Sequence, residues 1–229
     1  ASVAVLEQET IGWGASSRNG GMALTGLKIE MRAAVKRYGL DLGRHLWEWS
    51  LAAIDHLECT LAEERIDCDF ARSGHLLQAA KPSHYQGMAH EKEWMAAEFG
   101  YHKLQLVPPA QLRAEVGTAE FHGGLLDSGS AGLHPARYVF GLAQAAARRG
   151  ALLVERAQVT GIVRQGGGFA IGTSRGMVQA REVLLATNGY TSNLVPAARA
   201  GIFPVGSYIV VTEPLAPDLQ AEISPHGRM

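Results

Sequence analysis

The feature of the sequence that most constrains the fold lies near its start. Residues 3–6, Val-Ala-Val-Leu, form a short apolar run that ends in the acid Glu7. An apolar run of this length, with β-branched residues and a charge at its end, is typical of a buried parallel strand. The next stretch, residues 11–26, is rich in glycine, serine and asparagine and has little hydrophobic periodicity. It predicts a loop with one helical turn.

The order of strand, acid and small-residue loop predicts a nucleotide-binding segment. An acid at the carboxyl end of a Rossmann strand accepts hydrogen bonds from the ribose hydroxyls of adenosine. In residues 15–21, small side chains let the backbone approach a ligand, and serine hydroxyls and backbone N–H groups suit a pyrophosphate. Arg18 adds a positive charge. Two plainer interpretations stay open here: Glu7 as a solvated strand-end residue, and the loop as a flexible surface loop.

The rest of the chain alternates between helical and extended patterns, which predicts an α/β or α+β architecture with a nucleotide-binding part and a second, sheet-containing part. Three glycines at residues 166–168 predict a hairpin turn, since glycine takes positive φ without penalty. We expect helices over residues 40–64, 84–99, 108–115 and 135–149, and strands over residues 71–80, 104–107, 123–126, 152–155, 158–164, 169–173, 177–179, 182–186 and 208–211.

Composition excludes several classes of function. The 229 residues are 47% hydrophobic and 19% charged, with a net charge of -1, so no electrostatic attraction to nucleic acid or to an anionic membrane is expected. No stretch approaches the ~20 apolar residues that span a bilayer, and the start lacks the pattern of a signal peptide. The two cysteines, Cys59 and Cys68, predict buried, reduced thiols in a cytoplasmic protein.

Neither a metal site nor a hydrolase site is expected. His84 and His90 are six residues apart and do not form the pattern H-E-x-x-H, and the other histidines have no second ligand at a suitable spacing. The segment GTSRG at residues 172–176 lies in a predicted hairpin, whereas a nucleophile elbow needs a turn from a strand into a helix.

The segment VLEQETIGWGASSRNGGM, residues 5–22, resembles the corresponding region of the D-amino-acid-oxidase superfamily of FAD enzymes, and is closest to its γ-glutamylputrescine oxidoreductase and glycine oxidase-like members. The resemblance implies that Glu7 binds the adenosine ribose. It implies that Ser16 and Ser17 lie by the pyrophosphate, with Ser17 standing where glycine is commoner. The residues that would approach the flavin are Arg18, Asn19, Gly20 and Gly21.

Two later segments resemble the same superfamily, so the resemblance covers essentially the whole chain. Residues 150–162 are similar to the strand that leads to the adenine pocket, where Val159 would contact adenine through its backbone. Residues 182–190 are similar to the strand that closes over the adenosine side, and its end would place Thr187, Asn188 and Gly189 there. By spacing alone, these three residues are only a turn after a strand.

The resemblance implies a Rossmann-like FAD-binding part over residues 1–70 and 135–203, and a substrate part over residues 71–134 and 204–229. It implies non-covalent FAD and oxidation of the C–N bond of a small amine or amino acid by hydride transfer to the flavin. No catalytic residue and no oligomeric state can be predicted. His75 and Tyr208 are candidates for the pocket wall, with ordinary sheet residues as the alternative.

The glycine-rich dinucleotide fingerprint that should precede Glu7 is not in this sequence, and we expect both parts to be incomplete at the chain ends. Two alternative functions therefore stay open. One is a truncated FAD-binding fragment without activity. The other is a dehydrogenase of the same fold that passes electrons to an acceptor other than oxygen.

Overall fold

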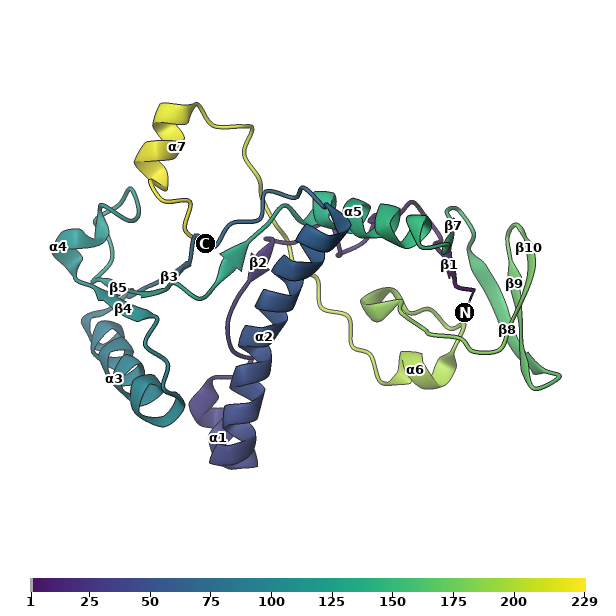
Figure 1. The fold of residues 1–229 in the computed structure, drawn as a ribbon, viewed down its shortest axis with the longest axis horizontal. Helices are drawn as coiled ribbons and strands as arrows, with labels where there is room; N and C mark the ends of the chain where they lie inside the picture. Colours follow the sequence, from purple (N-terminus) through teal and green to yellow (C-terminus); the bar gives the residue numbers. More distant parts are fainter. Residues whose placement is uncertain (1) are drawn as a thin grey trace. The chain divides into compact units, whose positions relative to one another are not determined.

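The computed structural model describes residues 2–229, which form two compact units (Figure 1). Unit 1 contains the chain as far as Arg18 together with Val139–Val210, and unit 2 contains Asn19–Tyr138 and Val211–Met229. The contacts of residues 19–70 therefore place them in unit 2, together with residues 71–138. The functional assignment of residues 1–70 and 135–203 to the cofactor stays a prediction.

Unit 1 contains a parallel strand pair that includes the first predicted strand. Strand β1 (Ala4–Leu6) pairs with β7 (Leu152–Val154), with Ala4 opposite Leu152 and Leu6 opposite Val154. Helix α5 (Pro135–Arg148) precedes β7 and is followed by Gly150 at φ 89°. A glycine with this φ is the usual end of a helix, so the sequence predicted this boundary correctly.

A three-stranded antiparallel sheet follows in the order β10-β9-β8, formed by β8 (Val159–Gln165), β9 (Gly168–Thr173) and β10 (Gly176–Ala180). Gln165 pairs with Gly168, which leaves Gly166 and Gly167 as a two-residue turn. Both turn glycines have positive φ, 58° and 81°. Such a turn matches the twist of the strands and favours glycine, as the sequence predicted.

Two predicted strands do not form, and these predictions were wrong. Residues 182–186 and 208–211 are irregular, and all of their side chains except the half-buried Leu185 are exposed: Leu184 is 89% exposed and Val210 is 94% exposed. Within residues 2–229 no strand lies beside either segment to accept and donate ladder hydrogen bonds. An apolar run becomes a strand only where such a neighbour exists. The short elements nearby are η1 (Asn188–Tyr190) and α6 (Pro196–Ala200).

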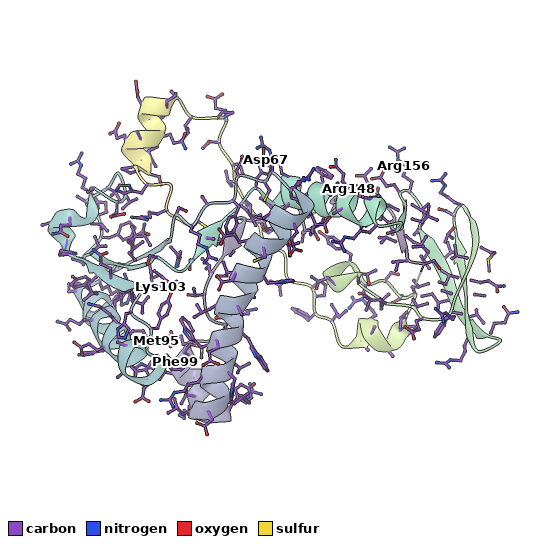
Figure 2. The ribbon with its side chains drawn as sticks, in the orientation of Figure 1. Asp67, Met95, Phe99, Lys103, Arg148 and Arg156 are labelled. Atoms are coloured by element: carbon purple, nitrogen blue, oxygen red, sulfur yellow. The ribbon has the colours of Figure 1, made fainter. Side chains whose placement is uncertain are left out.

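Unit 2 is built around an antiparallel sheet formed by β3 (His75–Gln78), β4 (Leu104–Val107) and β5 (Gly124–Asp127), in the order β3-β5-β4. Asp127, the last residue of β5, lies opposite His75 of β3 and Leu104 of β4. Helix α3 (Pro82–Phe99) packs against this sheet, and its Met95 is buried in the core to which Phe99 also packs (Figure 2). The short helix α4 (Pro109–Leu112) follows β4.

The remaining elements of unit 2 complete this core. Helices α1 (Met31–Tyr38) and α2 (Leu40–Glu64) pack together, and Trp47 of α2 makes edge contacts with the rings of Phe99 and Tyr101 at 6.0 and 4.8 Å between centroids. Strand β2 (Met22–Ala23) pairs with β6 (Ala131–Gly132). After α7 (Pro217–Ile223), Met229 extends the sheet at the edge of β3 through two backbone hydrogen bonds.

The thiol prediction was half wrong. Cys68 is buried, but Cys59 is exposed on α2. Ile54 and Leu61 form the buried face of that helix. Cys59 lies five residues after Ile54, which at 100° per residue turns it away from this face. Within residues 2–229 no helix combines the length and the apolar character needed to cross a membrane.

Candidate cofactor site

Glu7 lies at the carboxyl end of β1, held by the strand beside it. Its N–H donates to the carbonyl of Val154 at 2.9 Å, and its own carbonyl accepts from the N–H of Ala157 at 2.8 Å. One carboxylate oxygen, Oε1, accepts from the N–H of Glu9 at 2.9 Å. The side chain is half-buried. A carboxylate fixed by its backbone on both sides and still reachable from solvent suits an acceptor for ribose hydroxyls.

The segment before Val159 lies directly beside Glu7. Ala157 is buried, and Arg156 donates its N–H to the carbonyl of Glu9 at 2.8 Å. Arg156 has a positive φ of 51°, so the chain turns sharply before β8 begins at Val159. These hydrogen bonds join two of the segments in which the sequence predicted cofactor contacts. The adenine contact of Val159 itself stays a prediction.

The loop between Ile11 and Arg18, called here the 11–18 loop, is a series of tight turns. The N–H of Trp13 donates to Thr10, and that of Arg18 donates to Ala15 at 3.3 Å. The hydroxyl of Ser17 donates to the carbonyl of Gly12 within the same loop. Ser17 is therefore half-buried, whereas Ser16 is exposed.

Glycines allow the 11–18 loop to pack closely. A Cβ on Gly12, whose φ is +77°, would lie 3.3 Å from the Val139 side chain of α5. A Cβ on Gly14 would lie 3.2 Å from the ring of Tyr190. Both approaches are tighter than most Cβ contacts, so the absence of a side chain keeps the loop against its neighbours.

Two aromatic residues that the sequence analysis did not select connect the 11–18 loop to the turn at residues 187–190. The rings of Trp13 and Tyr190 make an edge contact at 5.9 Å between centroids. The guanidinium of Arg18 lies 4.9 Å from the centre of the Trp13 ring, a cation–π geometry. Trp13 is 43% exposed and Tyr190 is 61% exposed. In the sequence, the position of Trp13 between two glycines was the signal that could have selected it.

The turn that contains Thr187, Asn188 and Gly189 is stabilised by a residue just beyond it. The buried Thr191 donates its hydroxyl to the carbonyl of Asn188 at 2.7 Å, and its oxygen is 2.7 Å from the hydroxyl of Thr187. Asn188 has a positive φ of 44°, and a Cβ on Gly189 would meet no atom within 4 Å. The turn therefore has open space at Gly189.

Three further predicted site residues, Asn19, Gly20 and Gly21, belong to unit 2. The side-chain oxygen of Asn19 accepts from the N–H of Gly21 at 2.9 Å. Gly21 has φ +66°, and a Cβ there would overlap the carbonyl oxygen of Leu133. The resemblance implied that this glycine approaches the flavin, which stays a prediction. The structure adds a reason that lies within the chain itself, because the Gly21 carbonyl also accepts from the N–H of Leu133 at 2.9 Å.

The unit 1 residues present a set of groups that fits a dinucleotide. Glu7 offers an acceptor, Ser16 a hydroxyl, Arg18 a positive charge and Gly189 open space. Within residues 2–229 no group of three or more His, Cys, Asp and Glu side chains could hold a metal ion.

Comparison with known proteins gives a family match over nearly the whole chain. The family model described as "DAO: FAD dependent oxidoreductase" matches residues 1–228. A probable oxidoreductase OrdL of Haemophilus influenzae is 33% identical over 218 residues, covering 93% of this chain and 50% of that protein. The γ-glutamylputrescine oxidoreductase of Escherichia coli is 30% identical, covering 97% of this chain and 52% of that protein. The chain thus spans about half the length of these curated relatives.

Among solved structures, glycine oxidase from Geobacillus kaustophilus superposes with a TM-score of 0.69 at 22% identity, covering 88% of this chain and 52% of that one. NikD, described as an unusual amino acid oxidase, superposes with a TM-score of 0.63 at 17% identity, covering 86% and 47%. These likenesses confirm the predicted fold class.

Proposed function

Because the chain belongs to the family of FAD-dependent oxidoreductases, we propose that the protein binds FAD non-covalently and oxidises the C–N bond of a small amine or amino acid. When bound, FAD supplies the acceptor for a hydride from the carbon that bears the amine. The observation that carries the proposal is the position of Glu7, fixed at the carboxyl end of β1 beside the segment that leads to Val159.

Each predicted residue of unit 1 has a role that its chemistry supports. The Glu7 carboxylate accepts hydrogen bonds from ribose hydroxyls, and the exposed Ser16 hydroxyl and Arg18 guanidinium offset the charge of the pyrophosphate. The Ser17 hydroxyl donates to the Gly12 carbonyl, so its role is to close the loop that lies by the pyrophosphate. The backbone of Val159 and the turn at residues 187–189 flank adenosine.

The substrate class rests on the relatives. Their names include a γ-glutamylputrescine oxidoreductase, a glycine oxidase and an unusual amino acid oxidase, all of which name amines or amino acids. A second candidate for the electron acceptor also has support. The L-proline dehydrogenase of P. horikoshii superposes with a TM-score of 0.60 at 20% identity. Reoxidation of the flavin by a quinone-like acceptor instead of oxygen is therefore the alternative. With either acceptor, we propose that the protein is located in the cytoplasm.

The test compares the full protein with Glu7→Gln and, as a control, Glu9→Gln. Loss of a charged hydrogen-bond acceptor weakens FAD binding by about 10- to 100-fold in Glu7→Gln, since such bonds contribute about 1.5–3 kcal/mol. Glu9→Gln keeps the backbone N–H that donates to Glu7 and retains the wild-type Kd. Titration of apoprotein with FAD, followed by flavin fluorescence, gives each Kd.

A wild-type protein that takes up no FAD overturns the proposal. Equal Kd values for Glu7→Gln and wild type would remove Glu7 from the site while leaving FAD binding intact. Anaerobic bleaching of the bound flavin by a panel of amines and amino acids then identifies the substrate class. Reoxidation by air, compared with a quinone, separates the two acceptors.

A further inference from the structure

A buried carboxylate in unit 2 has no role in the cofactor contacts described above. Asp127, at the end of β5, is 8% exposed. Its local sequence, DSGSAGLHP at residues 127–135, is typical only of a turn. A buried carboxylate costs several kcal/mol unless donors surround it, so its surroundings need an explanation.

Four donors surround Asp127. Oδ1 accepts from the hydroxyl of Tyr101 and from the N–H of Gly129 at 2.9 Å. Oδ2 accepts from the hydroxyls of Thr25 and of Ser130, the latter at 3.3 Å. Burial, and to a smaller extent the hydrogen bond to Asp127, raises the pKa of the Tyr101 hydroxyl, so this donor keeps its proton. Both carboxylate oxygens are thus satisfied by fixed partners.

One of these donors links Asp127 to the predicted flavin loop. Thr25 belongs to residues 19–26, called here the 19–26 arm, which begins with the predicted site residues Asn19, Gly20 and Gly21. The N–H of Thr25 also donates to the hydroxyl of Ser130 at 3.3 Å. Thr25 is therefore held through its backbone and its side chain by the turn that Asp127 organises.

The arm is held along its length by the same part of the chain. Met22 and Ala23 pair with Gly132 and Ala131, and the carbonyl of Gly21 accepts from Leu133. At its far end, the N–H of Gly26 donates to Ser50 of α2 at 2.9 Å. The position of residues 19–21 in unit 2 thus depends on residues 127–133, with Asp127 at the centre of the hydrogen bonds.

We propose that Asp127 is a positioning residue, which fixes the 19–26 arm through Thr25 so that Asn19–Gly21 can meet the flavin. This inference rests on the proposed function, because it concerns residues that are predicted to contact FAD. It requires no contact between Asp127 and the cofactor. Disturbing the link therefore loosens the arm and weakens FAD binding, although the changed atoms lie four residues along the chain from Gly21.

The experiment uses Thr25→Val, which keeps the shape of the side chain but removes its hydroxyl, and Thr25→Ser, which restores it. Glu115→Gln is the control for stability alone, since it removes an ion pair with Arg228 that joins other parts of unit 2. Ser130→Ala is a milder variant that acts on the same arm if Thr25→Val does not fold. FAD titration and hydrogen exchange of the apoprotein are measured for all of them.

We expect Thr25→Val to bind FAD about 3- to 10-fold more weakly, the effect of one hydrogen bond, and to exchange the amides of the 19–26 arm faster. Thr25→Ser and Glu115→Gln should bind FAD like wild type. If wild type binds FAD and Thr25→Val binds it equally well, the positioning role is overturned and the proposed function stands. If Glu115→Gln weakens binding as much, the effect is one of stability and the role is also overturned. If wild type binds no FAD, both fail together.

Discussion

Replacing Gly21 with alanine tests whether the backbone of the 19–26 arm tolerates a side chain. Gly21 has φ +66°, a conformation that costs an L-residue about 1–2 kcal/mol. A Cβ there would overlap the Leu133 carbonyl oxygen, and it would lie 3.1 Å from both the Leu133 carbonyl carbon and Cδ of Pro135. Relieving such an overlap by moving backbone costs about 1–3 kcal/mol more.

The shift also disturbs the hydrogen bond from the Leu133 N–H to the Gly21 carbonyl, 2.9 Å long, which contributes about 0.5–1.5 kcal/mol. The free energy of unfolding of Gly21→Ala should therefore fall by roughly 3–6 kcal/mol. Two control variants in unit 2 separate these causes. Gly100→Ala has φ +60° but no atom within 4 Å of the new Cβ, so it should lose about 1 kcal/mol.

Gly20→Ala, one residue away, has ordinary φ, and its Cβ would touch only the flexible end of Met22 at 3.4 Å. It should change stability by less than about 0.5 kcal/mol. Urea unfolding followed by tryptophan fluorescence measures all three, because the buried Trp47 reports on the core of unit 2. If Gly21→Ala loses no more stability than Gly100→Ala, the overlap with Leu133 is not the reason for this glycine.

Two further predictions concern titration and thiol reactivity. Burial and the hydrogen bond to Asp127 raise the pKa of Tyr101 above its ordinary 10.0. Above that pH the unfolded chain loses a proton that the folded protein keeps, so the protein becomes less stable. The urea concentration at the unfolding midpoint should therefore fall less in Tyr101→Phe than in wild type between about pH 9 and about pH 11, and an equal fall in both proteins would contradict this. Ellman's reagent should react rapidly with exposed Cys59 and only after unfolding with Cys68, whose thiol pKa is raised by burial and by the nearby Asp67 and Asp69; a rapid reaction that persists in Cys59→Ser would refute the assignment.

Features encoded by neighbouring residues could be predicted from the sequence. The strand before Glu7, the turns of the 11–18 loop and the glycine hairpin at residues 166–167 all depend on local patterns of apolar residues and glycines. The strands predicted over residues 182–186 and 208–211 depend on a partner instead. An apolar run does not determine whether a partner strand lies beside it, so these predictions could not be secured from the run alone.

Contacts between distant residues were outside the reach of the sequence. Trp13 and Tyr190 meet across a long stretch of chain, and Thr25 and Asp127 do so in unit 2. In each pair the local sequence suggested only a loop or a turn. What distinguishes Asp127 from an ordinary turn residue is its burial with four donors, a property of the folded chain.

Ser17 illustrates how geometry changes the meaning of a residue type. The resemblance implied a departure from the family at this position, where a serine in place of glycine adds bulk near the phosphates. The structure shows that the hydroxyl donates to the Gly12 carbonyl within the 11–18 loop. The extra atoms therefore close the loop, and the proton of the hydroxyl is satisfied without a ligand. A serine is thus compatible with this loop, and the positive charge of Arg18 remains exposed for the phosphates.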